Sequence, residues 1–118
     1  MGYDTPILGD VRQYCVGQSE DDFFDPTLLI HINSAFLELK DIGALKNPFE
    51  ISTKEETWND IPDDFNILPY IKEWIEIKVK TLFDPPKSSS QNEAYKAQLD
   101  RLEFRMWAMG NYSSEDNT

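Results

Sequence analysis

The side chains with the greatest chemical reactivity in this chain are one cysteine and one histidine, Cys15 and His31. A thiol and an imidazole can form a nucleophile–base pair, but the pattern places these two in separate helices and no further motif supports a pair. Because no second imidazole or thiolate accompanies His31, the sequence offers no zinc-type ligand set. We interpret Cys15 as a small core residue of the first helix and His31 as an ordinary, partly exposed side chain.

Clustered carboxylates are the other candidates for chemistry. One cluster lies between two predicted helices and consists of Glu20, Asp21, Asp22 and Asp25. It lacks the glycine at position six and the bidentate glutamate at position twelve of a calcium loop. A second cluster, which we interpret as a solvated loop, consists of Asp60, Asp63 and Asp64. Exposed carboxylates do not acquire the separated pKa values that acid–base catalysis requires.

Sequence motifs for nucleotide, nucleophile or metal chemistry do not occur in the chain. We find no P-loop, G-x-G-x-x-G, G-x-S-x-G, C-x-x-C or H-E-x-x-H pattern. The sequence therefore predicts a protein that is not an enzyme and that uses no cofactor and no metal ion.

The charge of the chain excludes several classes of partner. With a net charge of −11 over 118 residues, contacts to nucleic-acid phosphates or to an anionic membrane would work against a repulsive field. Residues 1–66 carry fourteen acids and four bases, a net charge of −10, whereas residues 67–112 carry six acids and seven bases, a net charge of +1. This asymmetry allows an acidic face at one end of a single domain, and the alternative is an ordinary solvated acidic surface.

Targeting signals are also missing from the pattern. The N-terminus lacks the basic start and apolar run of a signal peptide, and Pro6 occupies the position where a myristoylation motif needs Ser or Thr. A single cysteine rules out an internal disulfide, and no apolar stretch reaches the roughly 18 residues of a membrane span. We expect a protein made in a cytoplasm that leaves it only within a larger particle.

Three helices are predicted before the first sharp corner of the chain. The first has Thr5 as its cap, Pro6 in its first turn and Gly17 as its stop. The second covers residues 26–42, opens on Asp25 as its cap and is closed by Gly43. The third covers residues 67–83 and carries two adjoining apolar stripes, which is typical of the central helix of a fold.

A fourth helix follows a corner made by Pro85 and Pro86, which cannot continue a helix. Ser88, Ser89 and Ser90 are candidate N-caps, and Ser90 with Glu93 has the spacing of a capping box at its start. Its apolar seam has helical spacing and consists of Tyr95, Leu99, Leu102, Met106 and Met109. We therefore expect the third and fourth helices to form an αα-hairpin. Two aromatic residues lie off the seam, with arginines nearby: Phe104 and Trp107. They either complete a small core or contact another protein, since aromatic residues and arginine are enriched in protein contacts.

The segment 44–66 is the least regular part of the sequence. It contains "FEIS", which predicts a short extended piece, and Ser52 with Glu55, which predicts one helical turn before a core residue, Trp58. Long connections of this kind often carry function. The predicted fold class is all-α: a small four-helix bundle of residues 1–112 with an irregular 44–66 loop, a C-terminal αα-hairpin and a disordered polar tail at 113–118.

Several segments, in order, resemble the small helical head–tail connector (adaptor) proteins of tailed bacteriophages and prophages. The resembling segments are "ILGDVRQYCVG", "FDPTLLIHINSAFLELKDIGA", "FEISTKEETWNDI", "YIKEWIEIKVKTLFDPPKSS" and "QLDRLEFRM". The most specific are "INSAFLEL" closed by a glycine, and "KVKTLFDPP" followed by serines and a helix with "LEFR". The C-terminal "WAMGNYSSEDNT" departs from the family pattern.

The resemblance implies a subunit of the phage neck, made in the bacterial host and placed in the virion. About twelve such copies would form a ring that docks on the portal, extends the DNA channel and receives the next neck, stopper or tail protein. DNA would pass through without specific binding, and an acidic lining would keep it from adhering. The runner-up reading is an acidic helical binding module, an inhibitor that covers a basic partner as a DNA mimic.

Site residues follow from position within this expected assembly. Those expected at the portal are Arg105, Trp107 and Tyr112. Those expected at neighbouring subunits or at the channel belong to the 44–66 loop and are Phe49, Glu55, Glu56, Asp63 and Asp64.

Overall fold

Helices make up the chain in the order that the sequence predicts. The structure, a computed structural model, describes residues 3–17 and 22–116, and from residue 110 on it describes the backbone alone. The elements are α1 (Ile7–Val16), α2 (Asp25–Asp41), η1 (Trp58–Asp60), η2 (Phe65–Ile67), α3 (Leu68–Phe83) and α4 (Ser89–Asp116), where η denotes a 3₁₀ turn. No strand occurs among the described residues, so the predicted all-α class is confirmed.

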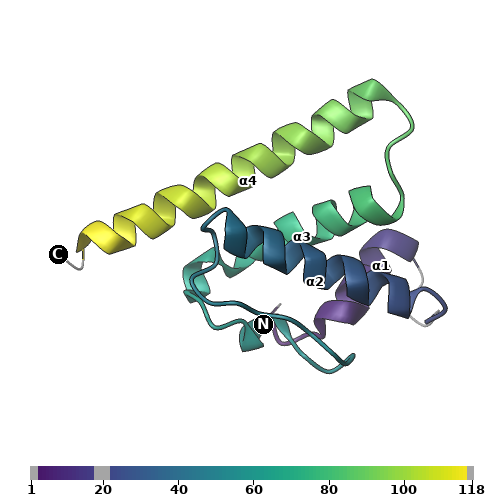
Figure 1. The fold of residues 1–118 in the computed structure, drawn as a ribbon, viewed down its shortest axis with the longest axis horizontal. Helices are drawn as coiled ribbons and strands as arrows, with labels where there is room; N and C mark the ends of the chain where they lie inside the picture. Colours follow the sequence, from purple (N-terminus) through teal and green to yellow (C-terminus); the bar gives the residue numbers. More distant parts are fainter. Residues whose placement is uncertain (1–2, 18–21, 117–118) are drawn as a thin grey trace.

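The central element is α3, which contacts α1, α2 and α4 (Figure 1). Its Ile71, Trp74 and Ile75 are fully buried, as the two apolar stripes predict. The side chains that complete this core come from every helix and from the 44–66 segment; the largest are Ile7, Val11, Leu28, Ile32, Phe36, Leu39, Ile51, Trp58 and Met106. Because one contiguous core joins all four helices, the molecule is a single small bundle.

The first two helices begin slightly differently from the prediction. Pro6, with φ −64° and ψ 137°, is the N-cap of α1 and not its first helical residue, and the Thr5 hydroxyl donates to Asp10 instead of capping the backbone. Gly17 ends α1 with φ +82°, a conformation that favours glycine. Asp25 is the first residue of α2 and not its cap, since its carboxylate accepts hydrogen bonds from Arg12 at 2.8 and 2.6 Å.

The Pro85–Pro86 corner returns the chain along α3 as the αα-hairpin that the sequence predicts (Figure 1). Ser88 caps α4 by accepting a hydrogen bond from the Gln91 backbone N–H, so the predicted capping box from Ser90 to Glu93 is wrong by one half-turn. The seam buries Leu102 and Met106 against α3. Trp74 strengthens the hairpin by donating its indole N–H to Glu103 of α4 at 3.1 Å.

The C-terminal part of α4 projects beyond the rest of the bundle (Figure 1). Its backbone crosses residue 112, where the sequence predicts the end of the domain, and the helix ends at Asp116. Asn117 and Thr118 lie outside the described residues. The division into a domain of residues 1–112 and a polar tail therefore stays a prediction.

The 44–66 segment is held to the bundle at several points. Asn33 of α2 pairs with the backbone of Ile51, accepting from its N–H and donating to its C=O, both at 2.8 Å. The backbone N–H of Ile7 donates to Glu56 O at 2.8 Å beside an isolated bridge between Pro6 and Thr57. The segment is irregular, as predicted, and these bonds hold it against the bundle.

The predicted turn in this segment is displaced by five residues. Thr57 and Asp60 form the capping box that the sequence placed at Ser52 and Glu55, and the turn it starts is η1. The Glu56 carboxylate instead accepts from the backbone N–H groups of Ser52 and Thr53. Trp58 is fully buried, as predicted.

Candidate assembly surfaces

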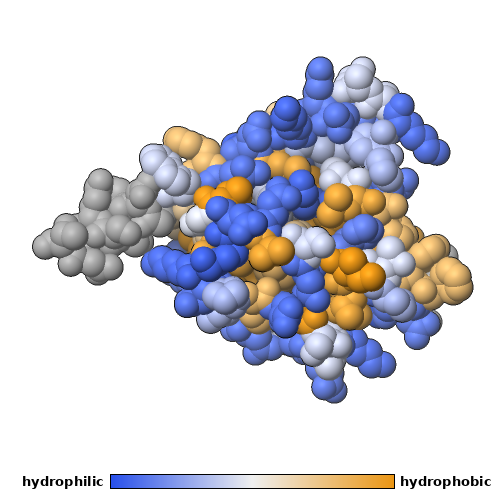
Figure 2. All heavy atoms as spheres, in the orientation of Figure 1, coloured by the Kyte–Doolittle hydropathy of each residue, from blue (hydrophilic) through white to orange (hydrophobic). Residues whose placement is uncertain are grey.

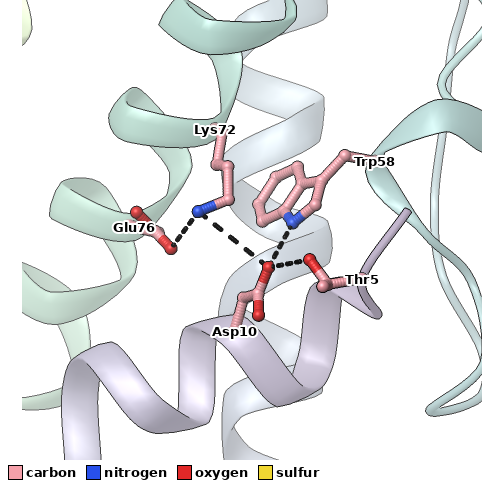
Figure 3. A network of polar contacts seen from close by, with 5 residues as sticks. All are labelled: Thr5, Asp10, Trp58, Lys72 and Glu76. Carbon is pink, nitrogen blue, oxygen red and sulfur yellow. Dashed lines mark hydrogen bonds and ion pairs between the residues drawn. The ribbon is translucent and has the colours of Figure 1, made fainter. Parts of the chain in front are cut away.

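A partly exposed polar network joins α1, η1 and α3 (Figure 3). Asp10 accepts hydrogen bonds from the Trp58 indole N–H, at 2.8 Å, and from the Thr5 hydroxyl, and it lies 3.9 Å from Lys72. Lys72 also pairs with Glu76 at 3.2 Å. Burial raises the pKa of Glu76, while the charge of Lys72 opposes that shift. Since each polar group of the network has a partner, we infer that the network stabilises the packing of these elements and has no catalytic role.

The lone thiol is poorly suited to nucleophilic chemistry. Cys15 is 8% exposed on α1, as its prediction as a core residue requires. Desolvation raises the pKa of the Cys15 thiol to about 11, although the charge of Lys80 acts in the opposite direction. The thiolate is the reactive form, so the folded protein presents very little of it near neutral pH. His31, half-buried, belongs to a different helix, α2.

Neither a metal centre nor a membrane span emerges from the described part of the chain. Within residues 3–17 and 22–116, no three His, Cys, Asp or Glu side chains are grouped so as to hold a metal ion. Of the acidic cluster between α1 and α2, Glu20 and Asp21 lie outside the described residues. No described helix combines the length and the apolar character needed to cross a bilayer.

The first exposed apolar surface is a groove between α2 and the residues that follow it, here called the α2 groove. Its volume is about 740 Å³, and its lining consists of Ile30, Asn33, Ser34, Phe36, Leu37, Lys40, Pro48, Phe49 and Glu50. Ile30 is 66% exposed and Leu37 is 62% exposed. Figure 2 shows hydrophobic side chains over α2, set among hydrophilic ones. Exposed apolar side chains gathered in this way make the groove a candidate contact surface.

The second exposed apolar surface, here called the α4 patch, consists of Ile42, Phe104 and Trp107. The rings of Phe104 and Trp107 stack with centroids 6.1 Å apart and planes inclined by 28°. They are 62% and 59% exposed, and they border a shallow hollow of about 370 Å³ together with Ile42, Ala44, Asp100 and Glu103. Stacked, exposed aromatic side chains are typical anchors of protein interfaces.

The three residues expected at the portal do not share one face. Arg105 and Trp107 are both exposed, but residues two apart on a helix point about 200° away from each other. Tyr112 lies in the part of α4 for which only the backbone is described. Its spacing of seven from Arg105 puts these two positions on the same side of α4. The portal set therefore separates into an Arg105–Tyr112 side and a Trp107 side.

The five residues expected at neighbouring subunits or at the channel have different surroundings. Phe49 packs its ring against Phe36, with centroids 5.1 Å apart, and lines the α2 groove. Three of the carboxylates accept backbone N–H groups and so hold the 44–66 segment in shape; they belong to Glu56, Asp63 and Asp64. Glu55 is exposed. The structure tests none of these assignments, which stay predictions.

Both surfaces also contain residues that were not predicted from the sequence to be functional. Ile30 and Leu37 are seven apart on α2, away from the stripe of Leu28, Ile32 and Leu39 that forms the core. This second, narrower stripe at helical spacing is a signal that the sequence does contain. Ile42 could not be placed in the same way, because its neighbours Phe104 and Trp107 come from a distant helix.

An all-α domain with a complete core, and with exposed apolar side chains on two surfaces, is the kind of molecule that assembles with other proteins. The chain belongs to the phage connector protein family, whose model matches residues 7–113. This match confirms the resemblance seen in the sequence, and with it a structural role of the phage connector type. Searches of curated proteins and of solved structures found no match.

Proposed function

We propose that this protein is a ring-forming subunit of the phage neck, which docks on the portal and joins the head to the tail. Copies of the chain, about twelve as the family resemblance implies, would extend the DNA channel and receive the next neck, stopper or tail protein. Synthesis in the host cytoplasm precedes assembly into the virion. The proposal rests on membership of the connector family together with the two exposed apolar surfaces.

The observation that carries the proposal is the placement of apolar side chains outside a core that is already complete. The core is filled by buried residues of all four helices, yet Ile30, Leu37, Phe104 and Trp107 each remain about 60% exposed. A subunit that joins both copies of itself and a template needs more than one such surface, because each neighbour covers a different part of it.

The portal contact is best supplied by the projecting end of α4. This end reaches beyond the bundle, so a partner can surround it without displacing α1 or α2 (Figure 1). The Arg105–Tyr112 side of the helix combines an arginine and an aromatic residue, both of which are enriched in interfaces. We therefore assign the portal contact to this side of α4 and leave Trp107 for another neighbour.

The acidic half of the chain would face passing DNA. Residues 1–66 carry a net charge of −10, and exposed carboxylates such as Glu55 repel phosphates. Such a lining allows DNA to move without binding. A neutral or basic lumen in the assembled ring would contradict this part of the proposal.

The alternative function, an acidic DNA mimic, has less support. A mimic must present its carboxylates outward in place of phosphates. Here many carboxylates of residues 1–66 are engaged with groups of the same chain: Asp10, Asp25, Glu38, Glu56, Asp60, Asp63 and Asp64. Their partners hold the fold together, which leaves fewer free acids for a basic protein.

Co-sedimentation with purified portal particles tests the proposal. The protein should pellet with portals and should saturate at a fixed number of copies per particle. The Tyr112→Ala and Arg105→Ala variants should bind more weakly, while the Lys87→Ala control, at the exposed α3–α4 corner, should bind as the natural chain does. Failure to pellet with portals, combined with salt-sensitive binding to a basic nuclease, would favour the DNA-mimic alternative.

A further inference from the structure

We propose that the α4 patch of one copy docks into the α2 groove of a neighbouring copy, in a head-to-tail contact that builds the ring. This inference rests on the proposed ring function and adds to it the two surfaces that meet. The occupant of the groove is thus a second copy of this chain, and the anchors are the stacked rings of Phe104 and Trp107.

The groove has the form of an acceptor for a helix. Its apolar lining includes Ile30 and Leu37 on α2 and Phe49 on the opposite wall. The 48–51 wall is fixed in place, because Asn33 holds the Ile51 backbone through two hydrogen bonds of 2.8 Å. A preformed groove loses little conformational entropy on binding, which favours a helix with apolar anchors laid along it.

Each wall of the groove carries one charge of opposite sign. Lys40 lines the groove from α2, and Glu50 lines it from the facing segment. Neither side chain forms an ion pair with any other residue that the structure describes. The groove therefore offers an apolar floor between an unpaired cation and an unpaired anion.

The α4 patch presents the complementary pattern. Asp100 and Arg101 precede Phe104 by four and three positions, so they lie one turn away from it, on its two flanks. Both are exposed, and within the described residues neither forms an ion pair. Docking the Phe104 ring between the walls brings an acid and a base to Lys40 and Glu50. This charge complementarity identifies a second copy as the occupant.

The two surfaces are separate regions of the protomer. They share no residue: the groove is lined by α2 and residues 48–50, whereas the patch is formed by α4 and by Ile42, which follows the last residue of α2. A copy that occupies its neighbour's groove therefore keeps its own groove open for the next copy. A heterologous contact of this kind repeats until the rotation closes a ring.

Disulfide trapping tests the contact directly. In a Cys15→Ala background, the two single-cysteine variants Leu37→Cys and Trp107→Cys are mixed at high concentration and oxidised. The mixture should give a cross-linked dimer, while each variant alone should stay monomeric, because the contact joins unlike surfaces. A chain with both cysteines should give a ladder of oligomers. An uncross-linked mixture, or equal dimer yields from each variant alone, would overturn the proposal.

The matched control uses another exposed position of the same helix. Ala94→Cys lies ten residues before Phe104, about 15 Å along α4, and should not cross-link to Leu37→Cys. Charge exchange provides an independent measurement. Glu50→Arg alone and Arg101→Glu alone should each lower the cross-linking yield, and the two changes in one chain should restore it. If the combined variant remains as impaired as the single ones, the assigned charge pairing is wrong.

The experiment separates this inference from the proposed function. Cross-linking of the mixture with no binding to portal particles would keep the contact and reject the portal role. Rings on portal particles without cross-linking of Leu37→Cys to Trp107→Cys would keep the portal role and reject the contact.

Discussion

The indole N–H of Trp58 donates to the carboxylate of Asp10 at 2.8 Å, across 48 positions of the sequence. This bond fastens the 44–66 segment to α1, and the fully buried Trp58 ring fills the core beneath it. A segment without regular helices is thereby made part of the bundle.

Replacing Trp58 tests whether its hydrogen bond to Asp10 stabilises the fold. Trp58→Phe keeps an aromatic ring but leaves Asp10 without its indole donor, so we expect the free energy of unfolding to fall by about 1–3 kcal/mol. Urea titration followed by circular dichroism measures the change. The matched control is Trp107→Phe, since Trp107 is 59% exposed and should change stability by less than about 0.5 kcal/mol. Equal effects of the two substitutions would contradict the assigned role of Trp58.

Asn33 should control the local order of the groove wall. Asn33→Leu removes both hydrogen bonds to Ile51 and leaves its backbone N–H and C=O without their partner. We expect the Ile51 amide to exchange with solvent about tenfold faster or more, because an unsatisfied buried group costs about 1–3 kcal/mol. Hydrogen exchange monitored by NMR gives the rate. The neighbouring Ser34→Ala control should leave the exchange rate unchanged.

Glu56 should contribute to the acid sensitivity of the fold. Slight burial raises its pKa, but hydrogen bonds from the Thr53 hydroxyl and from the backbone of Ser52 and Thr53 outweigh that effect and lower the pKa to about 2 from 4.5. A folded pKa below the unfolded value stabilises the protein above pH 4.5, and this stabilisation is lost as pH falls toward 2.

Glu56→Gln should therefore be less stable than the natural chain at pH 6, and the difference should shrink between pH 4.5 and pH 2. Thermal unfolding at a series of pH values measures it. Glu55→Gln is the control, because it removes the adjacent carboxylate without touching the turn. A difference for Glu56→Gln that does not depend on pH would show that the carboxylate bonds do not stabilise the turn.

The thiol of Cys15 should be protected in the folded state. Its raised pKa, about 11, and its 8% exposure predict slow reaction with a thiol reagent at pH 8. Adding denaturant should make the reaction fast. The exposed thiol of Leu37→Cys provides the reference rate in the folded protein. If Cys15 reacts as fast as that reference without denaturant, the thiol is not buried.

The parts of the fold that could be predicted are those that depend on local sequence patterns. Helical spacing gave the core faces of α2 and α3, and the paired prolines gave the corner before α4, because both depend on neighbouring residues. Two cap positions differ from the prediction. Thr5 and Asp25 were predicted to cap helices, yet the Thr5 hydroxyl donates to the Asp10 side chain in the first turn of the same helix, and the Asp25 carboxylate accepts from Arg12 of α1.

The candidate surfaces could be predicted only in part. Phe104 and Trp107 lie off the α4 seam, a position compatible with either a core or a surface role, and the structure shows that both are exposed. The α2 groove could not be predicted from periodicity, because its far wall depends on the pairing of Asn33 with Ile51, 18 positions away. No spacing rule in the sequence indicates that pairing.

Electron microscopy of portal particles mixed with this protein tests the central claim most directly. The account predicts an added ring of density at the tail-facing side of the portal, built from repeated copies with α4 directed toward the portal. Portal particles that remain bare at saturating protein concentration, with the protein left free in solution, would contradict it.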